Sequence, residues 1–355
     1  MYILDNSDYL DDVRAVSRDG ASWQKLSDTS IVISGGSGLI GSFLVDVLMC
    51  RNIDCGMNCD IHVLGRSRGK AEERFRKYMQ HCNFHFIQHD INEPLDGSLL
   101  PDTVGYVVHL ASNTHPVAYA TEPISTITAN IIGTKNLLDF AVTHRAKRFA
   151  FASSNEIYGE NRGDTELFDE KYCGYIDCNT LRAGYPESKR CGEALCQAYL
   201  REKGLDVVIP RLTRSYGPTL LKSDTKALSQ FLSKALAGED IVLKSAGTQY
   251  YSYTYVADAV SGLLAVLLNG ETGEAYNIAD EKSDIMLKDL AAVIAESVGR
   301  KVVFEIPNAT EAAGFSKATK ARLDSRKLQS LGWKAMYDIR TGIKRTISIL
   351  RAMQE

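Results

Sequence analysis

Two side chains four residues apart, Tyr185 and Lys189, have the types and spacing of an acid–base pair. Positions i and i+4 of a helix lie on one face, so the phenol and the ammonium point to the same side. A cation beside a phenol favours the phenolate, so we expect Lys189 to lower the pKa of Tyr185 toward neutrality. Tyr185 would then act as a general base toward the hydroxyl group of a sugar or another alcohol.

Two further polar side chains, Ser154 and Glu156, follow an apolar run that predicts a strand at residues 149–152. In an open α/β sheet, ligands bind at the carboxyl ends of the strands, so both side chains are candidates for the same site. Ser154 can hydrogen-bond the oxygen that Tyr185 deprotonates. Glu156 adds a carboxylate for a second proton transfer; the alternative is a surface acid or an acid at a helix N-terminus.

A glycine-rich turn, Ser34-Gly-Gly-Ser-Gly-Leu-Ile-Gly41, separates an apolar β-branched run from a segment with helical periodicity. Strand, turn and helix are the context in which such a loop binds a dinucleotide. Glycines permit the tight turn and the close approach to a pyrophosphate, and the helix N-terminus offers free N–H groups. The turn fits two spellings of the motif, GxGxxG from Gly36 and GxxGxxG from Gly35.

The predicted dinucleotide contacts lie in this loop and at the ends of the next three strands. The second strand ends in Gly65-Arg66 instead of the acid that binds ribose hydroxyls, which favours NADP+ over NAD+ unless Arg66 is merely solvated. Asp90 is a candidate for the adenine amino group, or else a loop acid. The predicted contacts are Gly35, Gly38, Leu39, Ile40, Gly41, Arg66, Asp90, Ile91, Leu110, Ala111, Ser112 and Lys189, the last on the nicotinamide ribose.

The composition excludes several other classes of protein. The 355 residues are 45% hydrophobic and 24% charged, which is ordinary for globular chains. A net charge of −3 gives no bulk attraction to nucleic acid or to anionic membranes. No apolar run reaches the ~20 residues of a membrane span, and the N-terminus lacks the pattern of a signal peptide. The closest set of the eight cysteines is Cys50, Cys55 and Cys59, and no histidine lies at a metal-ligand offset beside it. We therefore expect reduced thiols, no metal site and a cytoplasmic location.

Short strands that alternate with helices predict an α/β, Rossmann-type, doubly wound parallel sheet. Residues 30–212, with roughly 250–265, would form this dinucleotide-binding domain. Residues 213–249 and 266–355 would form a smaller C-terminal α/β substrate lobe, and residues 1–29 an extension with a short polar helix and a turn near Gly20. The predicted strands are 31–34, 61–64, 84–88, 106–110, 149–152 and 207–209, and the predicted helices are 39–49, 124–143 and 185–203.

Residues 31–349 resemble the extended short-chain dehydrogenase/reductase family, the NAD-dependent nucleotide-sugar epimerases and dehydratases. Within it, residues 174–190 are most similar to the UDP-glucuronate decarboxylase branch. The resemblance rests on the glycine loop, on Ser154, Tyr185 and Lys189, and on the motifs Tyr158-Gly159, Tyr216-Gly217-Pro218, Tyr255-Val256-Ala257-Asp258 and Leu331-Gly332-Trp333.

The resemblance implies that tightly bound NAD(P)+ transiently oxidises a nucleotide sugar at C4, with Tyr185 as the base. Dehydration or epimerisation at the adjacent carbon would follow, with Glu156 as the second base. Asn155 cannot serve as the acid of a strict 4,6-dehydratase. The alternatives are UDP-glucuronate decarboxylase-like activity, an NADP-linked keto-sugar reductase in which Glu156 is incidental, and a non-catalytic dinucleotide sensor.

The chain also departs from the family pattern on the substrate side. Tyr251 stands where decarboxylases carry an arginine, and Arg214 replaces a usual asparagine. Arg214 is a candidate to supply the missing charge to the substrate, because arginine holds phosphate oxygens with two hydrogen bonds, and Lys226 is a further candidate. An internal salt bridge is the alternative for Arg214.

The remaining expectations concern the substrate and the subunits. The resemblance places Asn130 behind the active site. The helices at 124–143 and 185–203 commonly form a homodimer interface in this family, although their apolar faces equally suit a sheet-facing core. The predicted substrate contacts are His115, Asn155, Arg214, Lys226 and Tyr251.

Overall fold

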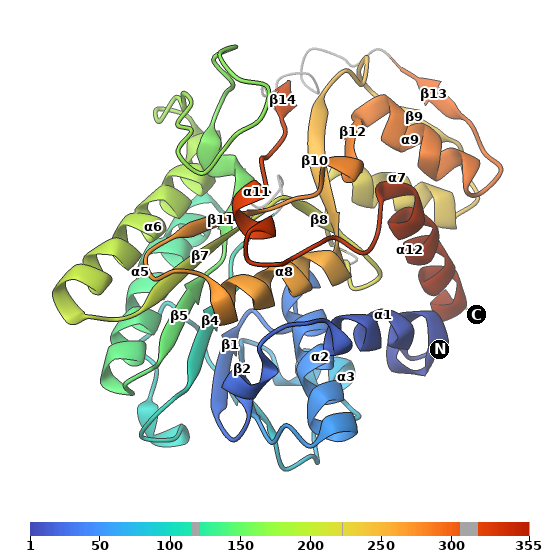
Figure 1. Cartoon of the computed structure of the whole chain (residues 1–355). Coiled ribbons are helices and arrows are strands. Elements are labelled where there is room, and N and C mark those ends of the chain that lie inside the picture. The colour runs from blue at the N-terminus through green and yellow to red at the C-terminus, as the bar shows by residue number, and fades with distance from the viewer. Residues whose placement is uncertain (115–118, 120, 222, 306–318, 355) are drawn as a thin grey trace.

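The computed structural model describes residues 1–114, 119, 121–221, 223–305 and 319–354. A parallel eight-stranded sheet lies at its centre, in the order β11-β7-β5-β4-β1-β2-β3, with β6 paired to β7 (Figure 1). The predicted α/β class is confirmed. The strands of this sheet are β1 (Ser30–Ser34), β2 (Asp60–Gly65), β3 (Phe84–Gln88), β4 (Tyr106–His109), β5 (Arg148–Phe151), β6 (Ser153–Ser154), β7 (Val207–Leu212) and β11 (Ala275–Ile278).

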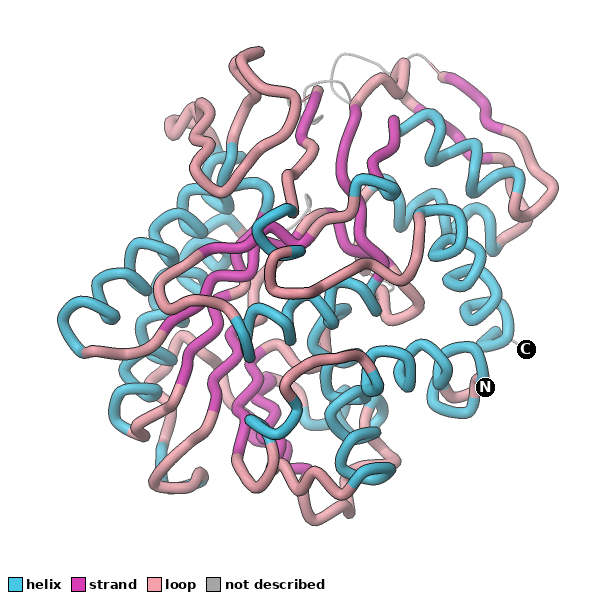
Figure 2. The backbone as a smooth tube through the Cα atoms, in the orientation of Figure 1, coloured by secondary structure: helices cyan, strands magenta, loops and turns pink. Residues whose placement is uncertain are grey.

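The central strand β1 shows why this sheet needs helices on both faces. All five of its residues are buried, and successive side chains point to opposite faces. Ile31 and Ile33 join the core on the side of α2 (Leu39–Cys55) and α8 (Val256–Asn269). Val32 joins the core on the side of α5 (Pro123–Thr143) and α6 (Gly184–Lys203), so helices cover both faces (Figure 2).

Some elements run further than the sequence predicted. Helix α2 was expected to end at residue 49 but continues to Cys55, where Gly56 in the left-handed conformation (φ 63°) terminates it. Gly204 ends α6 in the same way, at φ 68°. Strand β7 continues past residue 209 because its second half pairs with β6 and β11.

The smaller region beyond β7 contains two small sheets and several helices. One sheet has the order β12-β10-β14 with β8 paired to β10, and the other pairs β13 with β9. Its strands are β8 (Arg214–Tyr216), β9 (Ile241–Leu243), β10 (Tyr250–Tyr255), β12 (Asp284–Met286), β13 (Val302–Phe304) and β14 (Lys320–Ala321). The remaining α-helices in the described residues are α1 (Ser7–Arg18), α3 (Arg68–Arg74), α7 (Ala227–Leu236), α9 (Leu287–Glu296), α11 (Arg326–Gln329) and α12 (Ile339–Gln354).

The expected domain boundaries remain a prediction. Two strands, β10 and β11, pair with a different sheet from the one that these boundaries imply. Strand β10, which falls within 250–265, pairs with the smaller sheet, whereas α8 directly after it packs against β5 and β7 of the large sheet. Strand β11, which falls within 266–355, is the outermost strand of the large sheet. The chain therefore crosses between the two regions more often than its composition suggests.

The N-terminal segment contains the expected helix, but this helix is not a loose appendage. Helix α1 buries Tyr9, Val13 and Val16 and contacts α2, α8 and α12. The backbone turns at Asp19 and Gly20, as predicted. The two chain ends lie side by side at one corner of the molecule (Figure 1), where the Met1 amino group donates to the Met353 carbonyl at 3.4 Å.

Candidate active site

A cavity of about 1120 Å³ lies at the carboxyl ends of the large sheet and extends to β8 and β10 of the smaller region. Every predicted site residue within the described part of the chain borders it, whereas His115 lies outside the described residues. The bordering residues are Gly35, Gly38, Leu39, Ile40, Gly41, Arg66, Asp90, Ile91, Leu110, Ala111, Ser112, Ser154, Asn155, Glu156, Tyr185, Lys189, Arg214, Lys226 and Tyr251.

The glycine turn forms one end of this cavity, and its glycines are sterically required. Gly35 has a φ of 71°, and a Cβ there would lie 2.6 Å from the Ala111 nitrogen. A Cβ on Gly41 would lie 2.4 Å from the Gly35 carbonyl oxygen, so glycine lets α2 begin directly against the turn. Gly38 caps α2 without a side-chain hydrogen bond. The helix N-terminus therefore turns free N–H groups and its positive dipole end toward the cavity, which fits the phosphates of a dinucleotide.

The ends of β2 and β3 form the adjoining wall. Arg66 follows β2, is exposed and borders the cavity together with Lys70. Asp90 follows β3, and its Oδ1 accepts hydrogen bonds from the backbone and side-chain nitrogens of Asn92, both at 3.0 Å. This carboxylate therefore fixes the turn after β3, and its contact with an adenine amino group remains a prediction.

Tyr185 and Lys189 lie in the first turns of α6, and both are buried. Burial raises the pKa of Tyr185 to about 12, while hydrogen bonds with Ser154 and Tyr119 oppose this rise. Burial lowers the pKa of Lys189 to about 7, and its Nζ donates to the Ala152 carbonyl at 2.7 Å. The expectation that Lys189 lowers the pKa of Tyr185 toward neutrality is therefore wrong for this arrangement, because desolvation outweighs every nearby charge.

Two side chains that the sequence analysis missed cover Tyr185. The Tyr119 ring stacks on the Tyr185 ring, with centroids 4.8 Å apart and an interplanar angle of 24°. The Arg182 guanidinium lies 5.0 Å from the centroid of the Tyr119 ring, on which a cation is favoured. Neither residue belongs to a recognisable motif, because the stack joins segments that are distant in the sequence.

Glu156 lies in a 3-10 turn (Asn155–Tyr158) that begins at Ser154, whose Oγ accepts from the Glu156 N–H at 3.2 Å. One carboxylate oxygen accepts from Arg182 Nη2 at 2.7 Å, and the other lies 4.0 Å from Arg214 Nη2. The Glu156 side chain is 27% exposed. Glu156 is thus held in the cavity wall between two arginines.

Arg214 reaches the cavity from β8 and rests on the adjacent strand β10. Its guanidinium lies 3.6 Å from the centroid of the Tyr251 ring. Its Nη1 is buried and has no hydrogen-bond partner. An unpaired buried N–H of a cation is costly, so this atom is available to an anionic ligand. Arg214 thus places a positive charge beside Tyr251, and its ion pair with Glu156 at 4.0 Å is the internal salt bridge that was the alternative; binding of the substrate by this charge remains a prediction.

Cations outnumber acids in the described wall of the cavity, which suits a ligand with several negative charges. Lys226 is one of these cations, and its Nζ pairs with Asp224 at 3.0 Å. The cations are Arg66, Lys70, Arg182, Lys189, Arg214, Lys226, Lys234 and Lys244, and the acids are Asp90, Glu122, Glu156 and Asp224.

Buried polar side chains behind the site connect its two ends. Ser34 Oγ lies 2.7 Å from His109 Nδ1, and His109 Nε2 lies 3.1 Å from Thr134 Oγ1. Burial lowers the pKa of His109 to about 3, so its imidazole is neutral. Asn130 Nδ2 donates to Ser188 Oγ at 3.0 Å, which ties α5 to the first turn of α6. Asn130 therefore lies behind the active site, as the resemblance implied.

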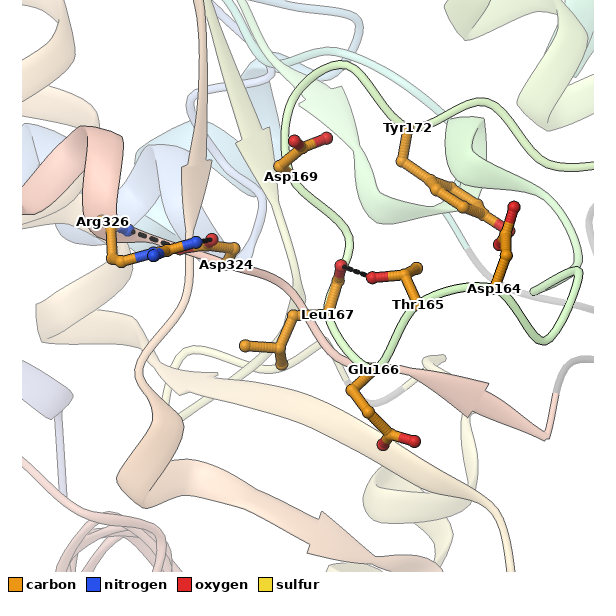
Figure 3. Close-up of a pocket in the computed structure, with 8 residues that line it drawn as sticks. All are labelled: Asp164, Thr165, Glu166, Leu167, Asp169, Tyr172, Asp324 and Arg326. Carbon is orange, nitrogen blue, oxygen red and sulfur yellow. Dashed lines mark hydrogen bonds and ion pairs between the residues drawn. The ribbon is translucent and has the colours of Figure 1, made fainter.

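A second cavity, of about 460 Å³, is bordered by residues of the loop after β6 and of the segment before α11 (Figure 3). Tyr172 donates to Asp164 at 3.1 Å, and Asp324 pairs with Arg326, so these acids already have partners within the protein.

Across the described residues, no group of three or more histidines, cysteines and acids could hold a metal ion. No helix in the same residues has the length and hydropathy to cross a membrane.

Comparisons with known proteins agree with this architecture. The chain is 32% identical to UDP-glucuronic acid decarboxylase 1 of Xenopus tropicalis over 321 residues, which cover 90% of this chain and 72% of that protein. It is similar to the UDP-glucose 4-epimerase of Thermotoga maritima solved with UDP-glucose, with a TM-score of 0.77, 25% identity, and coverage of 92% of this chain and 100% of that one.

The fold also matches that of UDP-glucuronic acid 4-epimerase from Bacillus cereus, solved with UDP-glucuronic acid and NAD. The TM-score is 0.77 at 20% identity, over 91% of this chain and 99% of that one. The profile of the NAD dependent epimerase/dehydratase family matches residues 31–279, which include the glycine turn, Glu156, Tyr185 and Lys189. The chain therefore belongs to the NAD dependent epimerase/dehydratase family.

Proposed function

We propose that this enzyme binds a nucleotide sugar beside NAD(P)+ in the large cavity and transiently oxidises the sugar at C4. The observation that carries the proposal is the convergence of Ser154, Tyr185 and Lys189 between the glycine turn and the two arginines of the opposite wall. When bound, oxidised NAD(P)+ supplies the hydride acceptor and a cationic ring that favours a nearby phenolate. The similar proteins named above act on or bind UDP-sugars.

In this proposal Tyr185 takes the proton of the C4 hydroxyl while the C4 hydrogen leaves as hydride. Ser154 hydrogen-bonds the same oxygen, and the Lys189 ammonium holds the nicotinamide ribose. With a pKa of about 12, Tyr185 is almost entirely protonated at neutral pH, so its action as a base depends on the positive charge of the oxidised cofactor, which would favour the phenolate. The stack of Tyr119 on Tyr185 keeps water from the phenol.

Glu156 performs the second proton transfer. The 4-keto group acidifies the hydrogen on the adjacent carbon, and the Glu156 carboxylate removes it. Elimination of a hydroxyl group then gives dehydration, whereas return of the proton to the opposite face gives epimerisation. Arg182 fixes the direction of the carboxylate by its hydrogen bond at 2.7 Å.

Decarboxylation of a nucleotide-linked uronic acid is the second candidate, and the arginines favour it. Arg214 has a buried Nη1 without a hydrogen-bond partner, and its Nη2 lies 4.0 Å from Glu156, so its guanidinium could hold a carboxylate on the sugar ring. Oxidation at C4 turns such a sugar into a β-keto acid, which loses carbon dioxide and leaves an enolate that takes up a proton. The Xenopus tropicalis relative is named for this reaction.

Incubation of the purified enzyme with UDP-glucuronic acid, UDP-glucose and dTDP-glucose, without added cofactor, distinguishes these reactions. Mass spectrometry would show loss of water for dehydration and loss of carbon dioxide for decarboxylation. An unchanged mass with a new anomeric NMR signal would show epimerisation. If none of these substrates is converted, and a nucleotide-linked keto sugar is instead reduced with equal consumption of added NADPH, the enzyme is a keto-sugar reductase and the transient oxidation is refuted.

Arg66 supports NADP+ over NAD+ as the bound cofactor, because the end of β2 offers a cation and no acid to the adenosine ribose. Mass spectrometry of the small molecules released from the native protein by mild denaturation tests this choice. Release of NADP+ supports the assignment, and release of NAD+ alone overturns it.

We also propose a cytoplasmic homodimer that associates through α5 and α6. These two helices pack against each other and leave Ile124 (76% exposed) and Ile132 (43% exposed) on the surface. Exposed apolar side chains on paired helices are typical of subunit contacts. Sedimentation of the wild type and of Ile132→Glu tests the interface: the variant should sediment as a monomer, and a monomeric wild type would refute the dimer.

A further inference from the structure

Helix α1 lies outside the residues matched by the family profile, yet two fully buried carboxylates connect it to the rest of the chain. Asp46 on α2 accepts hydrogen bonds from Tyr9 of α1 and from Arg74 of α3. This contact fixes α1 on the back of the helix whose N-terminus forms the dinucleotide end of the cavity. Val13 and Val16 add apolar packing to the same contact.

The second carboxylate, Asp12 of α1, is 0% exposed and contacts β10 and α12 of the smaller region. It accepts from the Tyr255 hydroxyl at 2.6 Å and from Arg345 Nε at 2.7 Å. The same Arg345 donates to the Asp8 carbonyl at 2.6 Å. A buried carboxylate with charge-assisted partners tolerates little displacement, so Asp12 holds the end of β10 and α12 in one place.

Strand β10 connects the contact of Asp12 with the cavity, because it carries both Tyr255 and residues that border the cavity. Side chains alternate along a strand, so Tyr251, Tyr253 and Tyr255 lie on one face. The first two border the cavity, and Tyr251 carries the Arg214 guanidinium. The third is the one that Asp12 holds. A single strand, β10, therefore connects helix α1 with the wall of the cavity that carries Tyr251 and Arg214.

We propose that Asp12 is a positioning residue that acts through Tyr255 to fix β10, and with it the Tyr251–Arg214 platform, for substrate binding. The segment before residue 31 thus becomes part of the substrate-binding apparatus, although none of its side chains borders the cavity. The kinetic part of its test rests on the proposed function, whereas the hydrogen-exchange part does not.

The test compares Tyr255→Phe, which removes one hydroxyl and keeps the ring, with Asp12→Asn. We expect both variants to raise the KM for the nucleotide sugar by about fivefold, with kcat and dinucleotide affinity within about twofold of wild type. Amide hydrogen exchange should accelerate in residues 250–255 and stay unchanged in the glycine turn. Asp206→Asn, which breaks the Arg148–Asp206 pair of the large sheet, is the control for a general loss of stability.

Two outcomes overturn the proposal. One is an unchanged KM with unchanged exchange in β10, which would leave Asp12 a purely structural residue. The other is the same KM and exchange profile in Asp206→Asn, which would show a global effect. If the wild type converts no nucleotide sugar, the proposed function fails, and the exchange comparison still decides whether Asp12 positions β10.

Discussion

The dinucleotide end and the substrate end of the cavity are built from different parts of the polypeptide. The dinucleotide end is formed by backbone: Gly35 and Gly41 admit no Cβ, and the N-terminus of α2 borders the cavity. The substrate end is made of long side chains, with Arg182 on Tyr119 and Arg214 on Tyr251. A binding site formed by backbone atoms tolerates few substitutions, because any side chain at its glycines would clash. A binding site formed by long side chains tolerates more, because the same charge can be supplied by a residue of a neighbouring strand. Dinucleotide binding and substrate binding therefore depend on different parts of the chain.

Loss of the phenol between the two ends should have the largest effect. Tyr185→Phe removes the proton acceptor and should lower kcat by about 10³-fold, because general base catalysis contributes on that scale. Dinucleotide binding, measured by fluorescence titration, should not change. Tyr119→Phe keeps the stacked ring and is the matched control. Turnover of Tyr185→Phe within tenfold of wild type would rule out the assigned role.

Glu156→Gln should separate the oxidation from the step that follows it. We expect kcat to fall by about 10²-fold while hydride transfer to the cofactor persists, because only the second proton transfer is lost. The near-ultraviolet absorbance of reduced nicotinamide, followed by stopped flow, measures this. Glu160→Gln, a change in an exposed acid, serves as the control. Normal turnover by Glu156→Gln would show that Glu156 is incidental.

The substrate end should respond to exchange of its cation. Arg214→Asn should raise the KM for the nucleotide sugar by about tenfold or more, since a hydrogen bond to a charged group contributes about 1.5–3 kcal/mol. Adding Tyr251→Arg to this variant should recover most of the affinity, because the charge returns from the neighbouring strand. If the double variant has the same KM as Arg214→Asn, Arg214 does not replace the charge of an arginine at position 251.

The large sheet and the smaller sheet should also differ in how their contribution to stability depends on pH. His62 lies on β2, and burial lowers its pKa to about 4, with a smaller effect from His85. Between that value and the ~6.5 of an unfolded histidine, the unfolded chain binds more protons. Stability from this site is therefore lost as the pH falls from about 6.5 to 4. His62→Gln should flatten this limb of a Tm–pH profile by on the order of 2–4 °C.

Asp284 on β12 should give the opposite slope. Burial raises its pKa to about 6, opposed by the hydrogen bond from Ser252 and the charge of Arg322. Between ~3.8 and 6 the folded chain binds more protons, so stability is lost as the pH rises through about 6. In Asp284→Asn, the decrease in Tm as the pH rises through about 6 should be smaller than in the wild type, by a few degrees at most. A steeper profile in the variant would contradict the assignment.

The difference between the dinucleotide end and the substrate end also explains which features could be predicted from the sequence and which could not. Strand β1, directly before the glycine turn, has a continuous apolar run at residues 31–33, and this local pattern predicts both the strand and its ends to within one residue. The pairing of Glu156 with Arg182 carries no local pattern, because the partners come from different loops. The role of Tyr255 was equally hidden, since its partner Asp12 lies in a segment whose polar composition suggested an extension.

One measurement tests the central claim, transient oxidation with return of the hydride, most directly. Purified enzyme with its native cofactor is mixed with UDP-glucuronic acid deuterated at sugar C4, without added NAD(P)H. The account predicts many turnovers per protomer, a transient of reduced nicotinamide that never exceeds one equivalent, and product that keeps its deuterium. Product formed with no such transient, or only with one NADPH consumed for each molecule, would contradict the account.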